Sequence, residues 1–178
     1  MLLAEYEQLY ALARLRLDAL DRRVPAAGAA LTTFVGLAPL APTATGLLIL
    51  VLVPASLVWF LRTAVNHARS FEDALRAIEQ IELRVNRLAP NTLLGFQSAH
   101  PSRGRSVGGR TGAETVSAVA SAAALLLGSC LYLVTEANAA TRPVPLSGYA
   151  AYVGIVASHL IGVLLSYRRY RYRVTRSG

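Results

Sequence analysis

The stretch VPAAGAALTTFVGLAPLAPTATGLLILVLVPASLVWFL, Val24 to Leu61, decides the fold because it contains no charged residue. A membrane-spanning helix needs about 20 apolar residues at a rise of 1.5 Å per residue, and this stretch is roughly twice that length. Its middle, APLAPTATG, is rich in turn-forming residues. We therefore predict a transmembrane hairpin, with spans over about 25–40 and 43–61, and a kink at Pro54 in the second span.

Two more apolar runs follow in the second half of the chain, at about 114–134 and 147–167. The composition agrees with extensive contact with lipid, since 54% of residues are hydrophobic and 16% are charged. A soluble domain carries about 25% charged residues. The sequence thus predicts an all-α integral membrane protein with four transmembrane helices in two hairpins. The expected segments are 1–23, an amphipathic helix; 24–61, the first hairpin; 62–112, a helix and a Gly/Ser/Arg-rich loop; 113–167, the second hairpin; and 168–178, a basic tail.

Two segments outside the spans have helical periodicity. In residues 1–23 an apolar stripe recurs every three or four residues: Leu2, Tyr6, Leu9, Ala13, Leu17 and Leu20. Residues 62–112 contain a heptad seam made of Phe71, Ala74, Ile78, Ile81, Val85 and Leu88, and Pro90 should end this helix. The helix either continues from the second span or begins afresh with a cap at Ser70. The seam could pair with the N-terminal stripe of the same chain or with a second copy.

The arginines predict the orientation in the membrane. All 18 basic residues are arginine, which suggests a bacterial source with a high-GC genome, and with four spans all of them except Arg142 fall on one side. Nine of the 10 acidic residues fall on that side too, so it carries the net charge of +8. The positive-inside rule then places both termini in the cytoplasm, as in a multi-pass protein of the bacterial inner membrane. The basic charge is thereby explained by anionic lipid headgroups, and no nucleic-acid partner is expected.

The segment GRSVGGRTG, Gly104 to Gly112, resembles two enzyme motifs at short range. It contains G-x-S-x-G, as in a hydrolase nucleophile elbow, and G-x-x-x-x-G-R-T, as in a phosphate loop with arginine in place of lysine. Both motifs need a preceding strand, which the sequence does not predict. We instead expect Thr111 and Glu114 to form a capping box at the start of the third span. The basic residues around it and in the tail are expected to bind anions or lipid headgroups: Arg103, Arg105, Arg110, Arg168, Arg169, Arg171 and Arg173.

Small residues recur every four positions along the fourth span: Ala150, Gly154, Ser158, Gly162 and Ser166. Such a ladder lets helices approach closely, either within one bundle or between subunits. His159 lies in the same span and is a candidate functional polar residue, because ionisable residues are rare inside membranes. We expect no metal site and no cofactor, and the single Cys130 should be a small buried apolar residue.

Taken together, the patterns favour a non-enzymatic, self-associating membrane protein, acting as a pore-forming effector or an assembly platform controlled through its cytoplasmic helices. The alternative is a membrane anchor for a separate cytoplasmic protein, docked through the seam or the basic tail. A small transporter or membrane enzyme using His159 is a third hypothesis. A homo-oligomer, anionic lipids and a cytoplasmic protein are the expected partners.

Overall fold

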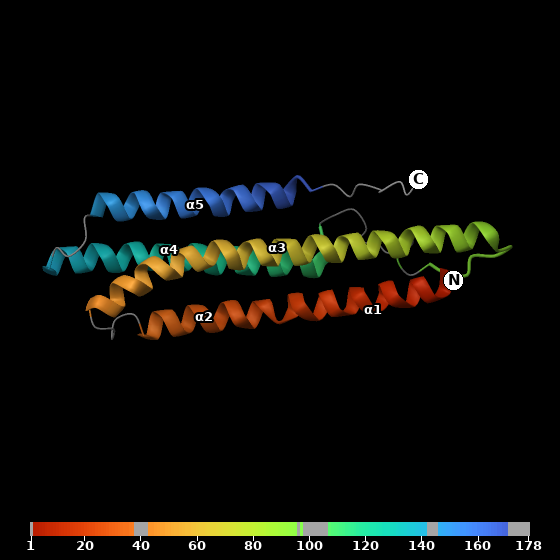
Figure 1. Cartoon of the computed structure of the whole chain (residues 1–178), viewed down its shortest axis with the longest axis horizontal. Coiled ribbons are helices and arrows are strands. Elements are labelled where there is room, and N and C mark those ends of the chain that lie inside the picture. The colour runs from red at the N-terminus through yellow and green to blue at the C-terminus, as the bar shows by residue number, and fades with distance from the viewer. Residues whose placement is uncertain (1, 38–42, 96, 98–106, 142–145, 171–178) are drawn as a thin grey trace.

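The computed structural model describes residues 2–37, 43–95, 97, 107–141 and 146–170, which form five α-helices and no strand. The helices are α1 (Leu2–Asp21), α2 (Arg23–Leu37), α3 (Thr43–Leu88), α4 (Gly109–Thr141) and α5 (Leu146–Arg168). They form an elongated bundle (Figure 1). Helices α2, α4, α5 and the N-terminal part of α3 occupy one half, whereas α1 runs along the C-terminal part of α3 in the other half.

Three of these helices, α3, α4 and α5, are long and apolar enough to cross a membrane. The predicted second, third and fourth spans fall on them. Helix α2 has 15 described residues, which reach about 22 Å at 1.5 Å per residue, less than the roughly 30 Å of a bilayer core. Residues 38–40 of the predicted first span lie outside the described part of the chain. The described part of the fold is thus all-helical and suited to a membrane, and the first of the four spans, over about 25–40, stays a prediction.

Helices α1 and α2 form an almost continuous helical run with an interruption at Arg22. Backbone bonds from Arg22 N to Asp18 O and from Ala26 N to Arg22 O span the interruption. Pro25 has no N–H to donate to the carbonyl of Asp21, four residues earlier, and its ring crowds that carbonyl. Pro25 therefore lies in the first turn of α2, where proline is favoured.

Pro54 lies inside α3, as predicted, and Figure 1 shows that the N-terminal part of this helix is bent. Because proline lacks an N–H, the carbonyl of Leu50 loses its partner in the helix. The hydroxyl of Tyr149 on α5 donates to this carbonyl at 3.0 Å. The next carbonyl, that of Val51, accepts from Tyr152 at 2.5 Å. The bend in α3 is thus stabilised by two tyrosines of α5.

The heptad seam is packed inside the chain. Helix α3 runs without a break from the apolar segment into the seam, so the alternative of a fresh cap at Ser70 is wrong. The first four seam residues, Phe71, Ala74, Ile78 and Ile81, are buried, Val85 is half-buried and Leu88 is 81% exposed. Helix α1 packs on α3. Of its stripe, Ala13 and Leu20 are buried, whereas the side chain of Leu2 lies outside the described part. The helix ends at Leu88, before Pro90, as predicted.

Candidate functional site

Two glycines bring the start of α4 against α3. Gly108 and Gly109 have φ values of +72° and +64°, a region that side chains rarely adopt. A Cβ atom on Gly108 would lie only 2.9 Å from the carbonyl oxygen of Ala68 on α3, whereas one on Gly109 would meet nothing within 4 Å. Gly108 is therefore required both for the turn and for the close approach of the two helices.

This turn is the described part of the segment Gly104–Gly112, in which the sequence contains two enzyme motifs. Residues 107–112 form the turn and then enter α4, whereas the positions before Gly104, where either motif requires a strand, lie outside the described part. Residues 104–106 lie outside the described part. The predicted capping box is wrong, because α4 begins at Gly109 and the Glu114 carboxylate accepts from Arg110 Nε at 2.7 Å.

Carboxylates of α3 hold the far end of the linker that joins α3 to α4. One oxygen of Glu72 accepts from the Gly108 N–H at 3.0 Å, and the other accepts from Arg76 Nε at 2.7 Å. Arg76 also donates to Glu79 at 3.3 Å. Burial alone would lower the pKa of Arg76, but these two carboxylates outweigh it and raise that pKa. The guanidinium therefore stays charged and compensates the charges of the two buried acids beside it, Glu72 and Glu79.

Glu82 holds the middle of the linker from a fully buried position. Its two carboxylate oxygens accept from the Gln97 N–H at 3.1 and 3.0 Å. The Tyr6 hydroxyl of α1 is 3.5 Å from the same carboxylate, and burial together with the Glu82 charge raises the pKa of the Tyr6 phenol. Glu82 thus connects α1, α3 and the linker.

Asn86 holds the near end of the linker. Its side-chain oxygen accepts from the N–H groups of Leu93 and Leu94 at 2.9 and 3.0 Å, and its amide nitrogen donates to the Leu94 carbonyl. Asn86, Glu82 and Glu72 lie along one helix and bind successive parts of the linker. The described parts of the linker are therefore folded back along α3.

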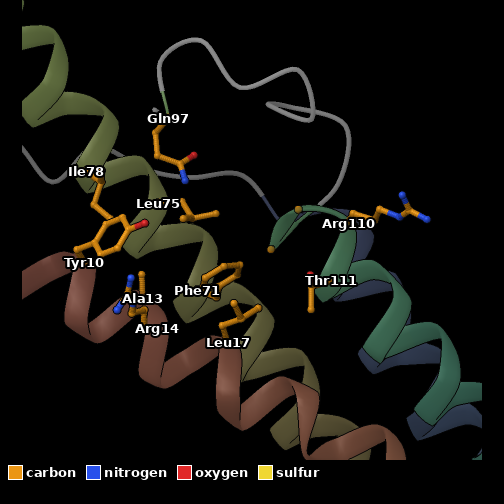
Figure 2. A pocket seen from close by; sticks show the side chains of 12 residues that line it. Tyr10, Ala13, Arg14, Leu17, Phe71, Leu75, Ile78, Gln97, Arg110 and Thr111 are labelled. Carbon is orange, nitrogen blue, oxygen red and sulfur yellow. The ribbon is translucent and has the colours of Figure 1, made fainter. Parts of the chain in front are cut away.

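A cavity of about 260 Å³ lies where α1, α3, the linker and the start of α4 meet. Figure 2 shows apolar side chains of α1 and α3 around it, among them Leu17, Phe71 and Ile78. Arg14 lines it from α1, with its guanidinium 5.2 Å from the centre of the Tyr10 ring. The lining can accept an apolar group, and Arg14 places a positive charge beside it.

The structure does not gather the predicted anion-binding arginines into one site. Arg110 lines the cavity, but its side chain points away from it in Figure 2 and pairs with Glu114. Arg168 and Arg169 are exposed at the end of α5. The remaining predicted residues, Arg103, Arg105, Arg171 and Arg173, lie outside the described part of the chain.

The small-residue ladder faces away from the bundle. All five of its residues, Ala150, Gly154, Ser158, Gly162 and Ser166, are exposed, and α5 packs inward through Tyr149, Val153, Val156 and Leu160. A Cβ atom added to either glycine of the ladder would meet nothing within 4 Å. His159 is also exposed, with Nδ1 3.2 Å from the Ile155 carbonyl of its own helix. Within one chain, Ser166 accepts a hydrogen bond from Arg69 of α3 at 2.9 Å, and the two glycines of the ladder leave open space outside the bundle.

Some contacts between α1, the C-terminal part of α3 and the linker could not be predicted from the sequence. Glu79 and Glu82 lie next to residues of the seam in the sequence, yet the structure buries both carboxylates, and Glu82 bonds to the linker at Gln97. Asn86 carries no distinctive spacing, although an amide shortly before a helix end is a common partner for loop backbone.

Among the described residues, no group of three or more His, Cys, Asp or Glu side chains could hold a metal ion. Comparison with protein-family models, curated proteins and solved structures finds no match to this chain.

Proposed function

We propose that this chain is a non-enzymatic membrane protein that associates with copies of itself through the outer faces of α5 and α4. In this proposal it spans the bacterial inner membrane four times, with both termini in the cytoplasm. The polar half, α1 with the C-terminal part of α3 and the linker, forms the cytoplasmic part that controls a pore or an assembly platform. The observation that carries the proposal is the outward orientation of the α5 ladder.

The outer face of α5 is better suited to another helix than to lipid. Small residues at every fourth position allow backbones to approach closely, and van der Waals contact drives helix association in membranes. His159 lies among them on this face. An ionisable side chain inside a membrane helix rarely faces lipid and usually faces a protein or water-filled interior. Contact with a second copy would remove His159 from lipid.

A hollow beside the ladder supports the same surface. It has a volume of about 540 Å³ and lies between α4 and α5. Small residues of α4, including Ser117 and Ser121, form one wall, and Ile161 and Leu165 of α5 form the other. Ser117 and Ser121 are four residues apart, the same spacing as in the ladder of α5. An apolar side chain from a neighbouring subunit would fit this hollow.

Disulfide crosslinking in membranes tests the proposed interface. Cys130 is buried and is the only cysteine, so Cys130→Ala gives a cysteine-free background. In that background Ser158→Cys should give crosslinked dimers on mild oxidation. Leu52→Cys, on an exposed position of α3 that we assign to lipid, is the matched control and should crosslink far less. Equal crosslinking at both positions would refute the α5 interface.

The alternative of an anchor docked through the seam has less support. Four of the six seam residues are buried inside one chain, so they offer little surface to another protein. A cytoplasmic partner would instead have to use Leu88, which is exposed, or the basic tail.

A further inference from the structure

A cluster of basic side chains forms where α1, α2 and α3 meet, away from the linker. Arg16 Nη1 on α1 lies 3.4 Å from His67 Nδ1 on α3. Arg23 Nη1 at the start of α2 donates to Thr63 Oγ1 on α3 at 2.9 Å, and its guanidinium lies 5.4 Å from the centre of the Phe60 ring. Thr63 and His67 are one helical turn apart, so they share a face of α3. Arg16 and Arg23 therefore lie against neighbouring turns of one helix.

The positive charge of this cluster lacks a negative partner among the described residues. No ion pair of Arg16 or Arg23 with a carboxylate is formed there. Arg16 Nε is buried and has no hydrogen-bond partner. Two guanidiniums and an imidazole thus share one site with an unused donor, an arrangement that an anion would stabilise.

The present contact also requires a neutral imidazole. A guanidinium can only donate, so Nδ1 of His67 must accept from Arg16. Burial, followed by the charges of Arg23 and Arg16, lowers the pKa of His67. An anion between these groups would reverse the effect of the two arginines and would favour the protonated imidazole, which is a further donor.

The cluster lies at both ends of the uncharged stretch. Arg23 immediately precedes Val24, and Thr63 follows Leu61 by two residues, so the first and last turns of the proposed hairpin meet here. The C-terminal end of α5 lies close to the same part of α3, because Arg69, two residues after His67, donates to Ser166 at 2.9 Å. This step rests on the membrane placement proposed above, in which the cluster lies at the depth of the headgroups of the cytoplasmic leaflet.

We propose that Arg16, Arg23 and His67 form a binding site for a phosphate group at the membrane surface, supplied by an anionic phospholipid. Protonation of His67 breaks its contact with Arg16, because both groups then only donate, so the Arg16 side chain is free to turn. The phosphate oxygens would then accept from the guanidiniums of Arg16 and Arg23 and from protonated His67. Arginine suits such an anion because its fork of N–H groups matches two phosphate oxygens. The site differs from the arginines of the linker and the tail, which the sequence singles out.

NMR titration of the His67 ring tests the proposal directly. The protein is placed in nanodiscs of phosphatidylcholine, in nanodiscs containing phosphatidylglycerol, and in phosphatidylcholine nanodiscs with added inorganic phosphate. His67→Gln identifies the His67 signal, and the rings of His100 and His159 are internal references. The titration midpoint of His67 should rise in phosphatidylglycerol. A rise of this midpoint with inorganic phosphate alone would also support the site and would identify a soluble phosphate as its occupant. The same midpoint in all three conditions would overturn the proposal.

Variants separate this site from a general attraction between charges. Arg16→Gln and Arg23→Gln should each weaken retention of phosphatidylglycerol about tenfold, as expected for loss of a charge-assisted hydrogen bond. Arg22→Gln is the matched control, because Arg22 adjoins Arg23 but is exposed. An equal loss for Arg22→Gln would refute a defined site. The titration midpoint of His67 reports on a site within one chain. The result therefore does not depend on whether the protein self-associates.

Discussion

The hydroxyl of Tyr149 on α5 donates a hydrogen bond, 3.0 Å long, to the carbonyl oxygen of Leu50 on α3. That carbonyl is the one that Pro54 deprives of its helical partner. Tyr149→Phe should therefore leave the partly buried Leu50 carbonyl unsatisfied and destabilise the protein by about 1–3 kcal/mol. Thermal or denaturant unfolding in detergent measures this loss.

A substitution at Pro54 provides a control for this prediction. Pro54→Ala restores an N–H four residues after Leu50, so the carbonyl can bond within α3. The effect of Tyr149→Phe should then be smaller in the Pro54→Ala background than in the wild type. Tyr132→Phe, at an exposed position of α4, should have little effect in either background. If the two substitutions are simply additive, the tyrosine does not compensate for the proline.

The two adjacent glycines before α4 should differ in their tolerance of a side chain. Gly109→Ala meets only backbone strain at positive φ, about 1–2 kcal/mol. Gly108→Ala carries the same strain and also places Cβ 2.9 Å from the Ala68 carbonyl oxygen, so α4 must move away from α3. We expect a clearly larger loss of stability for Gly108→Ala. Equal losses would show that the close approach of the helices is unimportant.

Removal of the Glu82 charge should release the middle of the linker. In Glu82→Gln the amide nitrogen would face the Gln97 N–H, so one acceptor is replaced by a donor. The expected loss is about 1–3 kcal/mol, with faster hydrogen exchange at the Gln97 amide. Glu7→Gln, at an exposed position of α1, is the control and should leave this amide protected. Unchanged exchange in Glu82→Gln would contradict the linker arrangement.

Stability should depend on pH through His67. Its pKa is lowered in the folded protein from the ordinary value of 6.5, so the unfolded chain takes up the proton first as the pH falls. The free energy of unfolding that the neutral His67 imidazole contributes is therefore fully present well above pH 6.5. It is lost as the pH falls through 6.5 towards the folded-state pKa. Unfolding in uncharged detergent from pH 8 to pH 5 measures it. His67→Gln should reduce the slope in this range, and an unchanged slope would place the titration elsewhere.

The helices and their faces are largely predictable because they depend on periodicity and on the absence of charge. The uncharged stretch indicates the hairpin, and the spacing of Phe71, Ala74 and Ile78 identifies the face of α3 that is buried. Pro25 and Pro54 act locally, so their effects on α2 and α3 also follow from the sequence.

The tertiary partners are not predictable in the same way. Glu72, Glu82 and Asn86 have no spacing that reveals a linker folded back on them, because each bonds to a backbone group outside the helix, at separations of 36, 15 and 7 residues. The capping box at Thr111 and Glu114 fits a real sequence pattern, but the glycine turn starts α4 two residues earlier. Arg16, Arg23 and His67 come from separate segments, and only the packing of α1 and α2 on α3 brings them together.

The most direct test of self-association is the mass of the protein in nanodiscs of native-like lipid, for the wild type and for a Gly154→Leu, Gly162→Leu variant. Both positions are exposed in one chain and a Cβ atom at either has nothing within 4 Å, so the fold should persist. Ser56→Leu, an exposed position on α3, is the matched control. We predict a discrete oligomer for the wild type and for Ser56→Leu, and its dissociation in the double glycine variant. A wild-type monomer, or an oligomer unaffected by both leucines, would contradict association through α5.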